Sequence, residues 1–175
     1  MSLAKRMQER RAAILGRWQR EVLESFPRQS RKLIAAREDR FANPLGFALR
    51  DGVEEVFSFV AGEKPWDAIE PALERLVKLK AVQQTHGQGP LEFLFSLKTI
   101  LREACGVGSV GGIAGEPLER APSDLEQWLV LEERFDRVIR AGAAAFVQAR
   151  EKILELQVNE MRNKTYMLRR LAGEP

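Results

Sequence analysis

Apolar side chains recur every three or four residues along most of the chain, the spacing of helices that each bury one face. The first such stripe runs from Leu3 to Val22 and ends at Phe26-Pro27, where proline interrupts the helical hydrogen bonds. A shorter helical segment is expected over residues 31–36. No segment alternates apolar and polar residues over the length of a strand, so the pattern predicts an all-α fold.

Turn and capping residues divide the middle of the chain into three further helices. Asn43-Pro44 is a start signal, because asparagine caps unpaired N–H groups and proline fits the first helical position. Gly62 is the matching stop, and Pro65 opens the next helix. The third helix follows Pro90 and is apolar on nearly every side, which predicts that it lies at the centre of the core.

A change of composition precedes the last helix. Residues 106–122 are rich in glycine and contain two prolines, which predicts a flexible loop. Ser123 and Glu126 form a capping box, and no proline follows until the last residue of the chain. A helix over about residues 123–171 would be about 70 Å long, longer than a compact domain of this size.

The predicted architecture is therefore a single domain, residues 1–175, built as a compact bundle of about five helices plus one long C-terminal helix.

The long helix carries two apolar stripes. The members of the first have the spacing of a seam packed against other helices, and they are Phe135, Ile139, Gly142, Phe146, Ala149, Ile153 and Leu156. A second stripe, rotated by about 100° around the helix axis, consists of Leu154, Val158, Met161, Thr165 and Leu168. We expect the first stripe to pack on the bundle and the second to bind a partner, most simply a second copy in a parallel homodimer.

Composition excludes most catalytic chemistry. The chain has one cysteine, Cys105, and one histidine, His86, whereas metal centres and nucleophilic sites recruit several such side chains. A hydrophobic fraction of 45% supports a core, and no apolar run is long enough to cross a membrane. The prediction is a cytoplasmic protein that is not an enzyme, with no catalytic residue, no metal and no cofactor.

Polar side chains near helix ends are the only candidate ligand site. Asn43, Gln83, Gln84 and His86 lie beside apolar helices and could orient a small ligand, although such residues more often cap helices. Gly106-Val107-Gly108-Ser109-Val110-Gly111 matches a dinucleotide-binding pattern but lacks the preceding strand and following helix, so we interpret it as part of the loop.

Charge is distributed unevenly. Residues 1–37 carry ten Lys and Arg against three Glu, and residues 161–175 carry four against one, so the middle of the chain is acidic. Basic ends could contact an anionic surface, but they also suit solvated helix faces. Few aromatic residues lie beside the charges, and nucleic acid is not an expected partner.

Three motifs resemble the RsbRD N-terminal domain family over roughly residues 13–160. They are Asn43-Pro44-Leu45-Gly46, then Leu79-Lys80-Ala81-Val82-Gln83-Gln84, then the helix that starts Leu91-Glu92-Phe93-Leu94-Phe95. Trp18 and the closing run from Arg150 to Glu160 also fit. Lys80 departs from the family pattern, which has arginine there.

The resemblance implies a helical sensory module of the kind found at the front of RsbT co-antagonist proteins and some sensor histidine kinases. It also implies kinship with the globin-like modules of stressosome proteins that hold no haem. The expected function is a non-enzymatic signalling input module that acts on a protein partner through its C-terminal helix. Two alternatives remain open, a small-molecule or redox sensor with a ligand in the bundle, and a scaffold subunit on an anionic surface. The chain is either a free-standing module or part of a longer protein.

Overall fold

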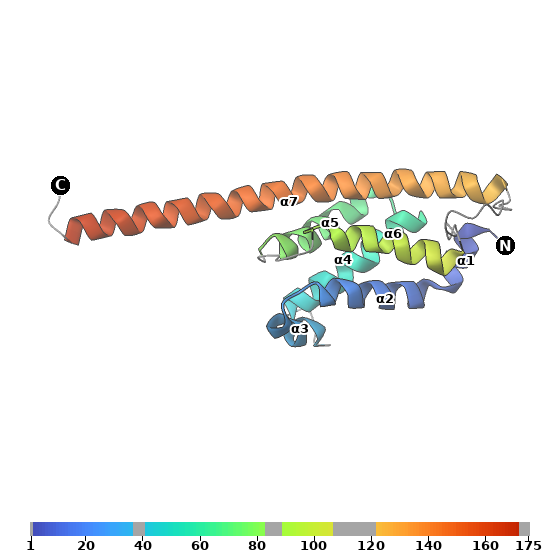
Figure 1. Ribbon diagram of the computed structural model, residues 1–175, viewed down its shortest axis with the longest axis horizontal. Coiled ribbons are helices and arrows are strands. Elements are labelled where there is room, and N and C mark those ends of the chain that lie inside the picture. Colours follow the sequence, from blue (N-terminus) through green and yellow to red (C-terminus); the bar gives the residue numbers. More distant parts are fainter. Residues whose placement is uncertain (1, 37–40, 83–88, 107–121, 172–175) are drawn as a thin grey trace, which may run out of the picture.

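Every regular element that the structure describes is a helix. The computed structural model describes residues 2–36, 41–82, 89–106 and 122–171. The helices are α1 (Leu3–Glu9), α2 (Arg11–Glu24), α3 (Arg28–Ala35), α4 (Pro44–Ala61), α5 (Trp66–Ala81), α6 (Glu92–Cys105) and α7 (Pro122–Leu171). The shorter helices gather beneath one half of α7, and the other half extends beyond them (Figure 1). The all-α bundle with a long C-terminal helix is confirmed.

The first predicted helix is two helices. Arg10 adopts φ −106° and ψ 7°, outside the helical range, and separates α1 from α2. The change of direction lets α1 reach α7, where the Leu3 N–H donates to Gln127 Oε1 at 2.9 Å. Leu3 and Met7 are both buried, so the break does not interrupt the apolar stripe. The stripe predicted the buried face correctly, but it contains no signal for the break.

Helix α4 is the centre of the bundle, since it makes the most extensive contacts with other helices, which are α2, α3, α5 and α7. Its Val53, Val56 and Phe57 have no exposed surface. Helix α5 crosses it closely at Gly52, where an added Cβ would lie 2.7 Å from Leu76 Cβ. The prediction that the helix after Pro90 is central was wrong. Helix α6 buries one face, against α1, α2 and α7, and leaves Phe95 46% exposed.

Helix α7 lies on the bundle by one face of its first half. Trp128, Leu131, Phe135 and Val138 are buried there, against a body that includes α4 and α5. At Gly142 the helix lies close to α6, because an added Cβ would lie 2.8 Å from Leu94 Cδ1. The predicted loop over 106–122 lies almost wholly outside the described residues. Among the described residues, no helix is both long and apolar enough to span a membrane.

Candidate functional site

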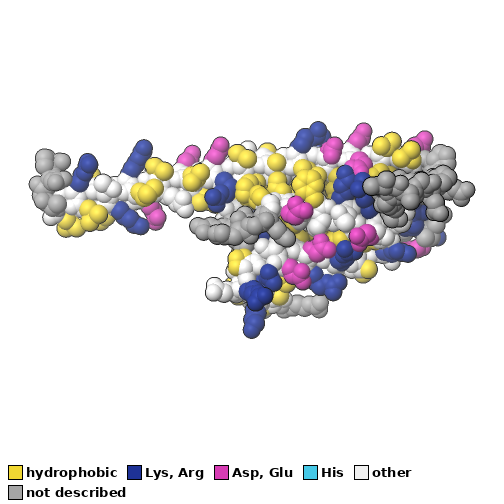
Figure 2. Space-filling view, in the orientation of Figure 1, with side chains coloured by type: hydrophobic (Ala, Val, Ile, Leu, Met, Phe, Trp, Pro, Cys, Tyr) yellow, Lys and Arg dark blue, Asp and Glu magenta, His cyan; other side chains and the backbone are white. Residues whose placement is uncertain are grey.

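Exposed large hydrophobic side chains are concentrated on the distal half of α7, which carries Leu154, Leu156, Val158, Met161, Tyr166, Met167, Leu168 and Leu171. From Leu154 to Arg169 every side chain is exposed. In Figure 2 apolar side chains alternate with charged ones along this half, which stands clear of the body. A helix in this state has no tertiary contacts to stabilise it.

The contact between α7 and the body, the bundle formed by α1 to α6, ends near Arg150. Its Nη1 donates to the backbone oxygen of Ala81, the last residue of α5, at 3.2 Å. A cationic side chain at that place satisfies a carbonyl that has no partner within its own helix. Ile153 is the last half-buried residue of α7. The contact between α7 and the body therefore stops about one turn after this hydrogen bond.

The two stripes of α7 have different surroundings. Phe135 and Gly142 are buried, and Ile139, Phe146, Ala149 and Ile153 are half-buried, so the first stripe faces the body as predicted except at its last member. Leu156 is 57% exposed and lies beyond the body. The members of the second stripe, Leu154, Val158, Met161, Thr165 and Leu168, are all exposed. We call these five residues the distal stripe.

The distal stripe can be buried without leaving a polar side chain unpaired. Its one polar member is Thr165, whose hydroxyl donates to the Met161 backbone oxygen at 2.9 Å. That internal bond satisfies the donor, so burial of Thr165 against an apolar surface would not leave it unpaired. The binding of a partner at these residues remains a prediction.

Asn43 is the one described member of the predicted ligand site. Its Oδ1 accepts from the Gly46 N–H at 2.8 Å, and its Nδ2 donates to the backbone oxygens of Leu33 and Ala36 at 2.7 and 2.8 Å. The amide thus caps α4 and ties it to the end of α3, the alternative role considered for it. Gln83, Gln84 and His86 lie outside the described residues, so the ligand site as a whole stays a prediction.

The motif around Asn43 has a steric basis as well. An added Cβ at Gly46 would lie 2.4 Å from the Ile34 backbone oxygen, so only glycine allows α3 and α4 to approach this closely.

Lys80 is a buried cation that the sequence reasoning did not identify. Its side chain is 2% exposed, and Nζ donates to the Ser25 backbone oxygen at 3.1 Å and to Ser25 Oγ at 2.8 Å. Nζ also lies 4.6 Å from the centre of the Phe26 ring. Burial lowers the pKa of Lys80 to about 8. The residue joins the last turn of α5 to the end of α2, and its departure from the family pattern was the only signal in the sequence.

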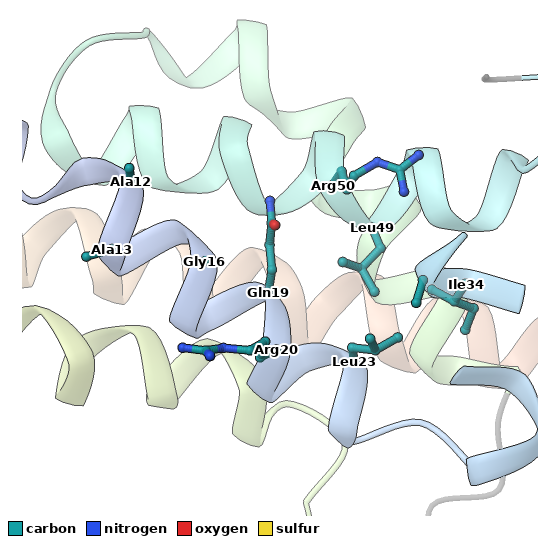
Figure 3. Close-up of a pocket in the computed structure, with 10 residues that line it drawn as sticks. Ala12, Ala13, Gly16, Gln19, Arg20, Leu23, Ile34, Leu49 and Arg50 are labelled. Atoms are coloured by element: carbon teal, nitrogen blue, oxygen red, sulfur yellow. The ribbon is translucent and has the colours of Figure 1, made fainter. Parts of the chain in front are cut away.

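A groove of about 790 Å³ lies between α2, α3 and α4. It runs along α2 past Ala12, Ala13 and Gly16, with Leu49 of α4 opposite and Ile34 of α3 at one end (Figure 3). We call it the α2–α4 groove. Its volume is within the range of small-molecule sites. Sequence reasoning did not find it, because its lining comes from three helices and includes small residues with no chemical signal.

Residues with metal-binding or nucleophilic chemistry are not brought together in the part of the chain that the structure describes. No group of three His, Cys, Asp or Glu side chains could hold a metal there. Cys105 is buried at the end of α6, and burial raises the pKa of its thiol.

Comparison with known proteins identifies one family. Residues 12–161 match the family described as the RsbT co-antagonist protein rsbRD N-terminal domain, in agreement with the resemblance carried by the three motifs. No curated protein and no solved structure matches the chain at a significant level, and the globin-like arrangement stays a prediction. Because the matched residues cover most of the chain, the protein belongs to the family of RsbT co-antagonist protein rsbRD N-terminal domains, and this membership indicates a signalling or regulatory input module.

Proposed function

We propose that the protein is a non-enzymatic, cytoplasmic input module that acts on a partner protein through the distal half of α7. In this proposal the distal stripe pairs with the same stripe of a second copy, in a parallel homodimer. The pairing brings two C-terminal ends together, where an effector protein binds them.

The exposure of the distal stripe carries the proposal. Leu154 is 52% exposed, Met161 59% and Leu168 67%, although the spacing of the stripe is that of a coiled-coil seam. Removing such side chains from water stabilises an assembly by about 1.5–3 kcal/mol each, less the entropy of association. An uncovered stripe of this kind is typical of an interaction surface.

Light scattering after size exclusion tests self-association. We expect the full chain to be a dimer at tens of micromolar and a truncation after Leu156 to be a monomer. A monomeric full chain, or a truncated chain that remains dimeric, would contradict the proposal.

Two methionines provide a matched pair of variants. Met161 belongs to the distal stripe, whereas Met167 is 65% exposed and lies about 120° away around the helix. Met161→Glu should abolish the dimer, because it places a charge in the seam, and Met167→Glu should leave it intact. Equal effects of the two substitutions would mean that the stripe is not the interface.

Cross-linking tests the parallel arrangement. In a Cys105→Ser background, Val158→Cys should form a disulfide between copies, because residues of a parallel seam face their own counterparts. Leu156→Cys lies on the far side of the helix and should not cross-link at the same rate. Failure of Val158→Cys to cross-link in a confirmed dimer would reject the parallel arrangement but not the dimer.

A further inference from the structure

The last turns of α7 carry a second row of side chains beside the distal stripe. Arg162, Tyr166 and Arg169 each follow a member of the distal stripe by one residue, so they lie about 100° from it around the helix axis. Their spacing of four and three residues places them in one row along the helix. We call these three residues the arginine–tyrosine ridge. The ridge flanks the proposed dimer seam and is not part of it.

No contact within the protein explains the ridge. Its side chains are all exposed, and Tyr166, which is 66% exposed, is the only tyrosine in the chain. Among the described residues, Arg162 and Arg169 make no hydrogen bond or ion pair. An arginine in the first half of α7 differs, because Arg134 Nη1 donates to the Val60 backbone oxygen at 3.2 Å. Arginine and tyrosine are enriched among the residues that contribute most to binding at protein interfaces, so the ridge has the composition of a protein-binding surface.

The end of α7 is positively charged by sequence alone. After Glu160 the chain has four cationic side chains and one carboxylate side chain, Glu174. No acidic residue lies three or four positions from Arg162 or Arg169, the spacings that allow an ion pair within a helix. Dark blue side chains accordingly predominate over magenta ones toward the free end of the helix in Figure 2. A partner that covers the ridge with good electrostatic complementarity therefore carries negative charge.

The spacing of the two arginines fits a partner helix. Arg162 and Arg169 are seven residues apart, which is about 10 Å along the axis of α7. Two carboxylates seven residues apart on a helix packed alongside have the same separation, and an apolar residue between them lies opposite Tyr166. In an extended chain, side chains on one face are about 7 or 13 Å apart, and neither separation matches that of the arginines.

The positive charge is confined to the end of α7. Glu151, Glu155 and Glu160 precede the ridge on exposed turns, and Lys152 Nζ pairs with Glu155 Oε2 at 3.1 Å. A nucleic acid strand or a membrane surface that lies along the helix would meet these carboxylates as well as the ridge. An acidic helix that packs on the last turns alone would not, so the charge pattern favours a protein partner.

We propose that the arginine–tyrosine ridge binds an acidic helix of the effector protein. Two carboxylates of that helix, seven residues apart, accept hydrogen bonds from the guanidinium groups of Arg162 and Arg169. An apolar side chain between them packs on Tyr166. This inference rests on the proposed function, in which an effector binds the paired C-terminal ends, and it specifies the chemistry of that effector.

Fluorescence anisotropy of a labelled helical peptide, titrated with the full chain, tests the proposal. The peptide is alanine-rich, with two glutamates seven residues apart and a leucine between them, and a comparison peptide has glutamine in place of both glutamates. We expect saturable binding of the glutamate peptide with half-saturation below about 1 mM, and binding of the glutamine peptide at least about tenfold weaker. Equal binding of the two peptides, or no saturable binding of the glutamate peptide, would overturn the proposal. Tighter binding of a single-stranded DNA oligonucleotide or of phosphatidylserine vesicles would also overturn it, in favour of those polyanions.

Two substitutions locate the contact. Arg162→Gln and Tyr166→Ala should each weaken binding of the glutamate peptide at least about fivefold, because each removes one part of the ridge. The control Arg140→Gln, on exposed surface in the first half of α7, should not change it. Both ridge variants should remain dimers, since the residue of a second copy beside Arg162 in a parallel seam is the neutral Gln157. Unchanged peptide affinity in both ridge variants would place the peptide elsewhere and overturn the proposal.

Light scattering on the same samples separates this inference from the dimer. A full chain that is monomeric but binds the glutamate peptide through Arg162 and Tyr166 would reject the dimer and support the ridge. A dimer that does not bind the peptide would support the dimer and reject the ridge.

Discussion

At the scale of single residues, the environment of a side chain decides its role, and the sequence shows that environment only in part. Asn43 was predicted to cap a helix or to bind a ligand, and its hydrogen bonds to α3 and α4 support capping. Lys80 reads as a solvent-facing lysine in a helix, but the turn of α5 that carries it lies against Ser25 and Phe26. Its burial depends on contacts across 55 residues of sequence, and no local pattern contains them.

The buried Lys80 predicts a pH dependence of stability. Between about pH 8 and its ordinary pKa of 10.5, the folded chain has released a proton that the unfolded chain still binds, so the free energy of unfolding rises with pH. We expect the free energy of unfolding of Lys80→Met to increase by on the order of 2–3 kcal/mol less over this pH range than that of the unsubstituted protein. Urea denaturation at pH 7.5 and pH 10 measures it. Lys78→Met, two residues away and exposed, is the control. An equal change in the free energy of unfolding with pH for the two variants would reject the explanation.

Two helical glycines should respond in opposite directions to alanine. Gly16→Ala should raise the free energy of unfolding by about 0.5–1 kcal/mol, because alanine favours helix and the added methyl meets open space. Gly52→Ala should lower it by about 1–2 kcal/mol, since the methyl would lie 2.7 Å from Leu76 Cβ and α4 and α5 must separate. Chemical denaturation of both variants checks the signs. A stabilising Gly52→Ala would show that the two helices can separate without cost.

At the scale of elements, the two halves of α7 should differ in stability. The side chains of residues 157–169 are all exposed, and an isolated helix of about this length is marginal in water. We expect their amide hydrogens to exchange rapidly in Met161→Glu and to be protected in the wild-type dimer, while α4 remains protected in both. Hydrogen exchange read by mass spectrometry measures this difference. Equal protection of the distal residues in both proteins would mean that pairing does not stabilise the helix.

Helix boundaries were predictable where a residue has a local reason to stop or start a helix. Asn43 and Gly62 bound α4 as predicted, with Gly62 at φ 83°, a conformation that glycine adopts without strain. Arg10 offers no such signal, so the break between α1 and α2 was missed. The central position of α4 was also missed, because composition reports how apolar a helix is and not how many neighbours cover it. The distal stripe was predictable since it depends only on spacing along one helix, whereas the α2–α4 groove needs three helices to be placed together.

At the scale of the whole molecule, charge accumulates at the end of α7. In a parallel pair, Lys164 of one copy lies beside Arg169 of the other, and these like charges oppose the apolar seam. Salt screens such exposed charges, so we expect the dimer Kd to fall several-fold between 50 and 500 mM NaCl. Sedimentation equilibrium measures the Kd. Arg169→Glu should tighten the dimer at low salt and flatten the salt dependence, and a Kd that rises with salt would contradict the pairing.

The length of α7 gives the molecule a mechanical property. The helix is held by the body up to Arg150, and residues 151–171 form an arm about 30 Å long. A tilt of about 5° where the helix rests on α4 and α5 therefore displaces its tip by about 3 Å, close to the radius of a helix backbone. A small rearrangement of the bundle would therefore move the end of α7 by several ångströms. A displacement of that size is large enough to change which side chains of α7 contact a partner.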